Sequence, residues 1–332
     1  MTINKPEITV IIIGYNVAQW IHRCLDSLLA QNYKNFVTVV VDDGSIDSTR
    51  DICDEYSKKD SRIKVFHTSN QGVSSARNLG LSKVDTTWFT FIDADDYVHP
   101  QYLSNLLLPT TKRKNIDLVQ CSYFVKIENN KSPQHCVKST LYTNDMEDIL
   151  SHIRGFVWSK LFKSSLIREY KIHFDQQISL AEDLCFVLDY LQYADMVCFS
   201  EQAEYVYEKR TGSVSKCRHK PEALYQQFHV EFKLIERLTQ RTSALSYSTF
   251  YRKKLLASSL MNYITSLYIG GYKSENINKI KNIPVQELNI LKYFSSTSRI
   301  KKIISILLFK QQWKLSDILL FSIYRLKQIS NH

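Results

Sequence analysis

Apolar runs and helical periodicity alternate along the first hundred residues of the chain. Four largely apolar runs are expected to form strands buried on both faces of a sheet, at residues 8–13, 36–41, 63–67 and 88–92. The segments between them carry apolar residues at helical spacing, over residues 20–29, 48–58 and 74–82. Four strands alternating with three helices predict an α/β fold, with a central mostly parallel sheet flanked by helices. Asn16 precedes the first helical segment and is expected to cap it.

Beyond residue 97 the alternation is less regular. One longer strand is predicted at residues 116–127, and short strands at 157–162, 195–200 and 204–210, with a helix at 180–193. From residue 220 onward the periodicity is helical. A boundary near residue 217 is therefore predicted, between a domain of residues 1–217 and a helical C-terminal region of residues 218–332.

Polar segments follow each of the first four predicted strands, where an open parallel sheet binds its ligands. They read GYN, DDGS, TSNQG and DADD. In the last of these, Asp93, Asp95 and Asp96 raise one another's pKa unless a cation is present. The cluster therefore indicates a divalent metal site, and Mg²⁺ or Mn²⁺ suits its oxygen ligands. A solvated turn is the alternative, because a D-x-D pattern also arises by chance.

Five motifs occur in the order and spacing of the family 2 glycosyltransferases of GT-A fold, which residues 8–215 resemble: VIIIGYN, VVVDDGSIDST, NQGVSSARNLGL, FIDADDY and LAEDLCF. The resemblance implies an inverting, metal-dependent enzyme that moves one hexose or N-acetylhexosamine from a UDP-sugar to a glycan or lipid-linked acceptor. Members of this type serve bacterial capsule, O-antigen or lipo-oligosaccharide synthesis. It also implies a nucleotide-sugar-binding half at residues 1–100 and an acceptor-binding half at 101–217.

The resemblance assigns the donor site to residues of the first four motifs. Asp43 is expected to hydrogen-bond the uracil ring, Asp93 to face the ribose, and Asp95 with Asp96 to hold the metal. Asp43 is alternatively a turn residue, and Arg77 a surface helix residue. The remaining positions that the resemblance places around the nucleotide are Gly14, Tyr15, Asn16, Asn70, Gly72, Arg77 and Asn78.

The acceptor hydroxyl needs a general base, since a metal can stabilise the departing diphosphate. By resemblance Asp183 is this base, and Glu182 supports or substitutes for it. The alternative for both is a favourable negative charge at the start of a helix.

Two further segments resemble parts of the family site. Trp158 matches an acceptor-side tryptophan that could stack on a sugar ring, with plain core packing as the alternative. Arg210 or Ser213 matches residues that touch the diphosphate when a lid closes. The family usually has an arginine directly after the second tyrosine of this segment, where this chain has Glu208.

The net charge of +10 is concentrated at one end of the chain. Residues 251–332 hold 14 Lys/Arg against 3 Asp/Glu, so they carry +11 and the remainder −1. Basic, aromatic-bearing amphipathic helices bind anionic membrane surfaces, which fits a lipid-linked acceptor. The alternative is a helical bundle that leaves its charges in water. No nucleic-acid-binding motif accompanies the charge.

Several other classes are disfavoured. The seven cysteines form no C-x-x-C pair, so a zinc knuckle or disulfide framework is not indicated. No signal peptide or membrane-spanning stretch is recognised, which favours a cytoplasmic protein, peripheral on the cytoplasmic face of the inner membrane. The Q-x-x-R-W motif of processive members is missing, so one sugar per acceptor is expected. A sugar-phosphate nucleotidylyltransferase or a dehydrogenase would need a glycine-rich phosphate loop after the first strand, and the segment there, GYNVAQW, has a single glycine. A catalytically degenerate membrane scaffold remains the non-enzymatic alternative.

Overall fold

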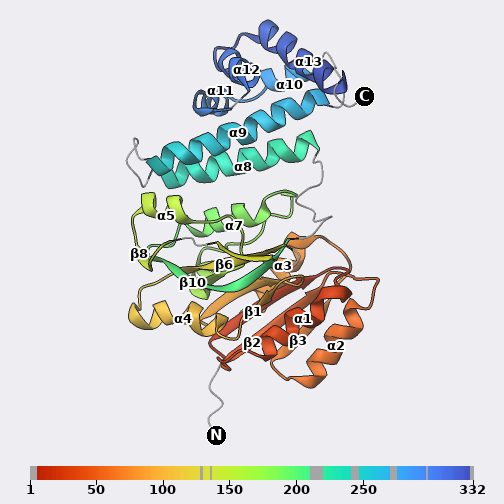
Figure 1. Ribbon diagram of the computed structural model, residues 1–332, viewed down its shortest axis with the longest axis vertical. Helices are drawn as coiled ribbons and strands as arrows, with labels where there is room; N and C mark the ends of the chain where they lie inside the picture. Colours follow the sequence, from red (N-terminus) through yellow and green to blue (C-terminus); the bar gives the residue numbers. More distant parts are fainter. Residues whose placement is uncertain are drawn as a thin grey trace. The chain divides into compact units, whose positions relative to one another are not determined.

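The computed structural model describes residues 6–127, 130–134, 137–209, 220–240, 247–269, 275–296 and 298–329. The chain divides into two compact units. The first comprises residues 1–177 and 182–216, and the second residues 178–181 and 217–332. Figure 1 shows the first unit as a sheet with helices and the second as helices alone.

The N-terminal unit begins with the predicted alternation of strands and helices. Its first four strands are parallel neighbours in the order β3-β2-β1-β4. The elements of this part are β1 (Ile8–Gly14), α1 (Ala18–Leu29), β2 (Phe36–Asp42), α2 (Thr49–Lys59), β3 (Ile63–His67), α3 (Val73–Ser82) and β4 (Trp88–Asp93).

The sheet continues beyond β4 with strands of mixed direction, in the order β4-β9-β6-β10-β5. Strand β9 is antiparallel to both β4 and β6, while β10 is parallel to β6. The elements are β5 (Tyr97–Val98), α4 (Tyr102–Lys112), β6 (Leu118–Ile127), β7 (Asn130–Gln134), β8 (Leu141–Thr143), α5 (Met146–His152), β9 (Lys160–Lys163), α6 (Ser164–Glu169), α7 (Glu182–Tyr190) and β10 (Val197–Glu208). The mixed, mostly parallel sheet confirms the predicted fold class.

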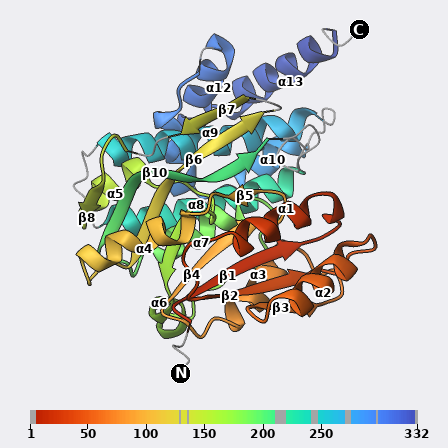
Figure 2. The ribbon, with the colours of Figure 1, turned by 60° about the horizontal axis from the view of Figure 1, so that its bottom comes forward.

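Burial on both faces explains why β1 and β2 are largely apolar, interrupted within the run by the buried Thr9 and Thr38. Alternate residues of β1, such as Val10 and Ile12, pack with α1, α2 and α4 in one core. On the opposite face of the sheet, Val39 and Val41 of β2 pack against Ala76 of α3. Because successive strand residues point to opposite faces, a strand covered on both sides is apolar at most positions of both faces. Figure 2 shows these helices on the two sides of the sheet.

Three local predictions differ from the structure. The two short strands expected after α7 form one strand, β10, with register irregularities between Ser200 and Tyr205. Asn16 does not cap α1: the N-cap is Val17. The backbone amides at the start of α1 instead donate to side chains around the start of α2: Val17 N donates to Thr49 Oγ1, and Ala18 N donates to Asp47 Oδ2. Helices α4, α5 and α6 were not predicted.

Every element of the C-terminal unit in its described residues is a helix, as expected. Its elements are α8 (Pro221–Thr239), α9 (Tyr247–Ile269), α10 (Asn276–Lys281), α11 (Val285–Leu288), the 3₁₀-helix η2 (Asn289–Tyr293), α12 (Arg299–Phe309) and α13 (Trp313–Ile329). Among the residues described, no helix has the length and apolar character needed to cross a bilayer. The five cysteines that lie in the described part, Cys24, Cys53, Cys121, Cys185 and Cys198, are free and buried.

Candidate active site

The strand ends that carry the polar motifs meet at one edge of the sheet. Gly14 is in register with Asp42 of β2, and Ile13 with Asp93 of β4. Asp42 is in turn in register with His67 of β3. The GYN, DDGS and DADD segments and the loop after β3 therefore leave the sheet side by side, as parallel pairing requires.

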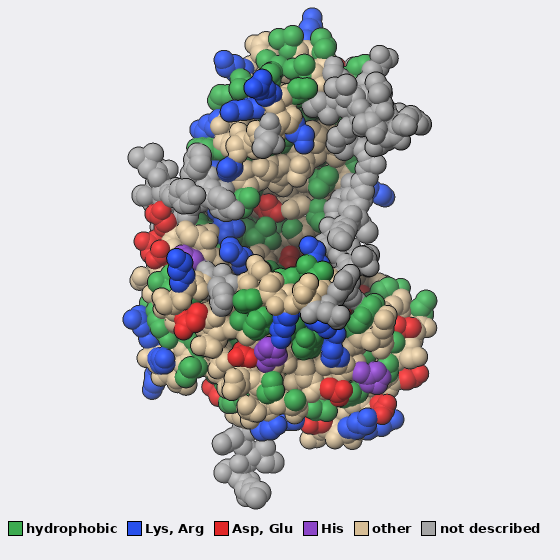
Figure 3. Space-filling model, in the orientation of Figure 1, with side chains coloured by type: hydrophobic (Ala, Val, Ile, Leu, Met, Phe, Trp, Pro, Cys, Tyr) green, Lys and Arg blue, Asp and Glu red, His purple; other side chains and the backbone are tan. Residues whose placement is uncertain are grey.

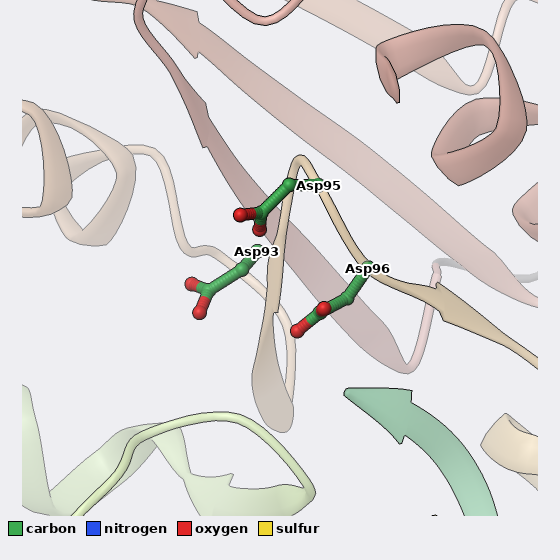
Figure 4. Close-up of side chains that lie close together, drawn as sticks. All are labelled: Asp93, Asp95 and Asp96. Atoms are coloured by element: carbon green, nitrogen blue, oxygen red, sulfur yellow. The ribbon is translucent and has the colours of Figure 1, made fainter. Parts of the chain in front are cut away.

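The acidic turn between β4 and β5 gathers three carboxylates. One oxygen from each of Asp93, Asp95 and Asp96 lies within 4.8 Å of the others. Figure 4 shows the three side chains pointing to the same side of the turn. Like charges this close are stable only with a cation or a proton nearby. An all-oxygen set of this kind suits Mg²⁺ or Mn²⁺.

Within this turn, Asp96 is the fully buried member. Its Oδ2 accepts a hydrogen bond from Tyr205 Oη at 2.7 Å, and its Oδ1 accepts one from Glu208 N at 2.9 Å. Burial, together with the charge of Asp93, holds the pKa of Asp96 well above its usual range. Tyr205 Oη also accepts from Asp93 N at 3.1 Å. Asp96 therefore ties the turn to β10; metal binding by Asp96 stays a prediction, which this geometry disfavours.

Arg23 of α1 supports the same turn and was missed by sequence reasoning. Its Nη2 donates to the Asp95 carbonyl at 2.8 Å, and its guanidinium lies 4.7 Å from the Tyr97 ring centroid. It also forms an ion pair with Glu208. Glu208 stands where the family usually has an arginine. This departure could have indicated Arg23, because a partly buried carboxylate at that position needs a basic partner.

Asp43 organises the loop that leads into α3. Its side chain is only 3% exposed. Its Oδ1 accepts from Gln71 N at 3.0 Å and from Thr68 Oγ1 at 3.1 Å, and its Oδ2 accepts from Gly72 N at 2.9 Å. The turn role that the sequence allowed for Asp43 is thus present in the structure. Its contact with a uracil ring stays a prediction.

The loop after β1 is joined to the loop after β2. Asn16 has a left-handed φ of 53°, and its Oδ1 accepts from Ile46 N at 2.9 Å. The backbone N–H of Asn16 donates to Ser45 Oγ at 2.9 Å. Tyr15 beside it is 46% exposed. The side chain of Tyr15 is thus open to a ligand, while Asn16 fixes the backbone on which it stands.

Residues 70–78, which the resemblance placed around the nucleotide, have different environments. Asn70 and Gly72 are exposed, and Gly72 has a φ of +90°, which favours glycine. Asn78 forms two hydrogen bonds of 2.8 Å with the backbone of Phe174, so its amide is used within the protein.

Arg77 joins the acidic turn to the start of α7. Its side chain is buried, and its Nη1 donates to Glu182 Oε1 at 2.6 Å. Its Nη2 lies 4.0 Å from Asp93 Oδ1. Its guanidinium carbon is 5.2 Å from the Phe174 ring centroid. The surface-helix alternative for Arg77 is therefore wrong, because the side chain bridges two carboxylates.

Asp183 stands next to this bridge in an environment suited to a base. Burial and the charge of Glu182 raise the pKa of Asp183 to about 6, although Arg77 acts in the opposite direction. Its Oδ1 accepts from Leu184 N at 2.8 Å. A carboxylate whose pKa lies just below neutral pH combines a large ionised fraction with useful basicity.

Two predicted residues remain outside this assembly. Trp158 is 7% exposed, and its ring stacks on Phe156 at 3.6 Å and on Tyr205 at 4.6 Å between centroids. Its acceptor role stays a prediction, and the packing favours the core alternative. Arg210, with Ser213, lies outside the described residues.

A parallel sheet whose strand ends gather an acidic turn, a basic bridge and a helix-start carboxylate has the architecture of a GT-A sugar transferase. Residues 9–170 match the model of Glycosyl transferase family 2. The uncharacterized glycosyltransferase EpsJ of Bacillus subtilis is 30% identical over 224 residues, which cover 65% of this chain and 65% of that protein. Residues 9–170 therefore form a domain of the family 2 glycosyltransferase type.

Other relatives agree on the class. Glycosyltransferase GlyA of Streptococcus pneumoniae is 29% identical over 228 residues, covering 63% of this chain and 32% of GlyA. The alignments thus span less than two thirds of either relative. The crystal structure of S. aureus TarS 1–349 in complex with UDP superposes with a TM-score of 0.70 at 20% identity, over 97% of this chain and 92% of that one. This likeness shows the shared fold.

Proposed function

We propose that the protein is an inverting, metal-dependent glycosyltransferase that moves one hexose or N-acetylhexosamine from a UDP-sugar to an acceptor hydroxyl. The bridge made by Arg77 is the observation that carries this proposal. It places the helix-start carboxylates, Glu182 and Asp183, next to the acidic turn at Asp93. Donor-phosphate binding and proton removal would then take place in one site, as a single displacement requires.

The donor side is built from the loops after β1, β2 and β3. We infer that the nucleotide lies against Gly14, Tyr15 and the loop that Asp43 holds at Gln71 and Gly72. The fixed backbone amides and the exposed Tyr15 ring favour a planar base there. Asp93, at the end of β4, is 38% exposed and would face the ribose.

The residues of the acidic turn fit a divalent cation. Their donor set is oxygen only, and burial together with the charge of Asp93 raises the pKa of Asp96. Asp95 would hold the ion, with Asp96 as its fixed support. A bound Mg²⁺ or Mn²⁺ would supply Lewis-acid stabilisation of the diphosphate leaving group.

Asp183 is the proposed general base. Above pH 6 its carboxylate is ionised and can accept the proton of the acceptor hydroxyl while that oxygen bonds to the anomeric carbon. The anomeric carbon–diphosphate bond breaks on the opposite face, which inverts the configuration. Glu182, paired with Arg77, would position Asp183 and keep its basicity high.

The relatives suggest the acceptor class. One is a teichoic acid poly(glycerol phosphate) polymerase of Staphylococcus epidermidis, 29% identical over 209 residues. Another is a cholesterol galactosyltransferase of Borreliella burgdorferi, 29% identical over 229 residues. TarS has also been crystallised with UDP-GlcNAc. On these likenesses we propose a lipid-linked glycan acceptor in surface polysaccharide synthesis, and a peripheral location on the cytoplasmic membrane face.

A donor panel tests the activity. The full chain is incubated with Mn²⁺ and each of several UDP-sugars, with and without lipid-linked acceptors, and released UDP is measured. We expect metal-dependent UDP release with at least one donor. Asp183→Asn should keep donor binding and lower kcat by about 10²–10⁴-fold, the usual contribution of a general base.

The matched control is Asp51→Asn, which removes an exposed carboxylate in the first turn of α2. It should transfer sugar like the wild type. Absence of UDP release with every donor would overturn the proposal. Wild-type turnover by Asp183→Asn would overturn the assignment of the base.

A further inference from the structure

Helix α12 carries apolar side chains on its solvent face as well as on its buried face. Its buried residues include Ile304 and Leu308. Ile303 and Ile306 are nevertheless 49% and 47% exposed. At 100° per residue, these two positions share a face with Arg299, Lys302 and Lys310. We call these five residues the basic apolar stripe.

Exposed apolar residues of the C-terminal unit are clustered rather than scattered. Of the eight large ones in its described part, six lie within residues 300–318, and the other two are Leu255 and Val285. Figure 3 shows hydrophobic and Lys/Arg side chains adjoining over the end of this unit where Figure 1 labels α12 and α13. A cluster of apolar side chains on a solvent-exposed face indicates an interaction site.

The positive charge of this region indicates which kind of partner binds the exposed apolar cluster. Residues 299–321 hold five basic side chains and one acidic one, Asp317. Asp317 is engaged within the unit, where its Oδ1 accepts from Tyr268 Oη at 2.7 Å. A symmetric contact with a second copy would bring the same cations face to face without acidic partners. An anionic lipid surface neutralises the cations and accepts the isoleucines.

We propose that α12 is an interfacial helix that binds an anionic phospholipid membrane through the basic apolar stripe. Ile303 and Ile306 enter the boundary between headgroups and acyl chains, and the long side chains of Lys302 and Lys310 reach the phosphates. The inference deepens the proposed function and rests on it for its biological role, since it would bring the enzyme to a lipid-linked acceptor.

Vesicle flotation of the full chain tests the proposal. Vesicles of phosphatidylglycerol with phosphatidylcholine are compared with pure phosphatidylcholine, at low and high salt. We expect flotation with the anionic vesicles alone, and release by about 0.5 M salt. The double variant Ile303→Asp/Ile306→Asp should lower the bound fraction at least tenfold, and Lys302→Glu/Lys310→Glu should do the same.

Val285→Asp is the matched control, because Val285 is 55% exposed in the same unit but lies on α11, outside the stripe. It should float like the wild type, and circular dichroism checks that all variants fold. Equal binding to both vesicle types, or wild-type flotation of the isoleucine double variant, would overturn the proposal. So would a dimer in solution that this double variant dissociates, because the stripe would then bind a second copy.

Failure of this proposal is distinguishable from failure of the enzyme proposal. Asp183→Asn should float like the wild type, since the base lies in the other unit. Ile303→Asp/Ile306→Asp should release UDP normally from donor and a water-soluble acceptor without vesicles. If this variant lost both flotation and vesicle-free activity, a general structural defect would explain both losses. The charge variant Lys302→Glu/Lys310→Glu would then decide, and its flotation like the wild type would overturn the membrane role.

Discussion

Asp183 is the residue at which environment and chemistry are most tightly linked. Burial and the charge of Glu182 raise its pKa, whereas Arg77 limits the rise. The two neighbouring side chains, Glu182 and Arg77, therefore influence the pH at which the base works. This coupling leads to two predictions.

The first prediction concerns pH. Because Asp183 must be ionised to accept a proton, kcat/KM should rise with pH through about 6 and then level off. Glu182→Gln removes a neighbouring negative charge and should move this limb to lower pH. Arg77→Gln removes a positive charge and should move it to higher pH. The measurement is a pH–rate profile for each variant, and identical limbs in all three proteins would contradict the assigned electrostatics.

The second prediction concerns stability. The pKa of Asp183 is higher in the folded protein, about 6, than the ordinary 3.8, so folding favours its protonated form. Its contribution to stability is therefore present below about pH 4 and is lost as the pH rises to about 6. Asp183→Asn should then raise the free energy of unfolding by about 1–3 kcal/mol at pH 8, with little change at pH 4. Urea unfolding at the two pH values measures this, and stabilisation at pH 4 alone would contradict the sign.

At the scale of elements, the acidic turn depends on a strand distant in sequence. Tyr205 of β10 donates to Asp96 and accepts from Asp93 N. Arg23 of α1 donates to the Asp95 carbonyl. The turn is thus fixed by a strand and a helix, so that its carboxylates keep their positions in spite of their repulsion.

The third prediction removes one of these supports. Tyr205→Phe leaves Oδ2 of the buried Asp96 without its donor, while Oδ1 keeps Glu208 N, and should cost about 1–3 kcal/mol of stability. It should also weaken Mn²⁺-dependent donor binding, measured by calorimetry. Tyr190→Phe is the control: Tyr190 is equally buried and its hydroxyl donates to the Asp117 carbonyl at 2.7 Å. This control should lose stability but bind donor normally, and equal binding losses in both variants would contradict a specific role for Tyr205.

At the scale of the whole molecule, we expect the two compact units to have separate roles, sugar transfer in one and membrane binding in the other. The proposed donor site uses residues of the N-terminal unit, and the basic apolar stripe belongs to the C-terminal unit. The uneven charge along the sequence fits this division, because the excess of basic residues is confined to the last quarter of the chain.

The fourth prediction follows from this division. UDP with Mn²⁺ should slow amide hydrogen exchange in peptides that contain residues 14–16, 43–45, 70–72 and 93–96, because bound ligand stabilises the folded loops. Anionic vesicles should instead slow exchange in residues 299–310. Hydrogen–deuterium exchange with mass spectrometry measures both effects, and protection of residues 299–310 by UDP alone would contradict the assignment.

The sequence by itself determined the alternating strands and helices, the polar strand ends and the motifs of the site, because burial on both faces of a parallel sheet produces largely apolar runs in the local sequence. Tertiary structure decided which side chains meet. The Arg77–Glu182 contact spans 105 positions and the Tyr205–Asp96 contact 109. Such pairs depend on strand order and on competition between donors, neither of which has a local signature. For the same reason, the sequence did not predict that Asp96 is buried against Tyr205, that Arg23 supports the acidic turn, or that residues 197–208 form a single strand.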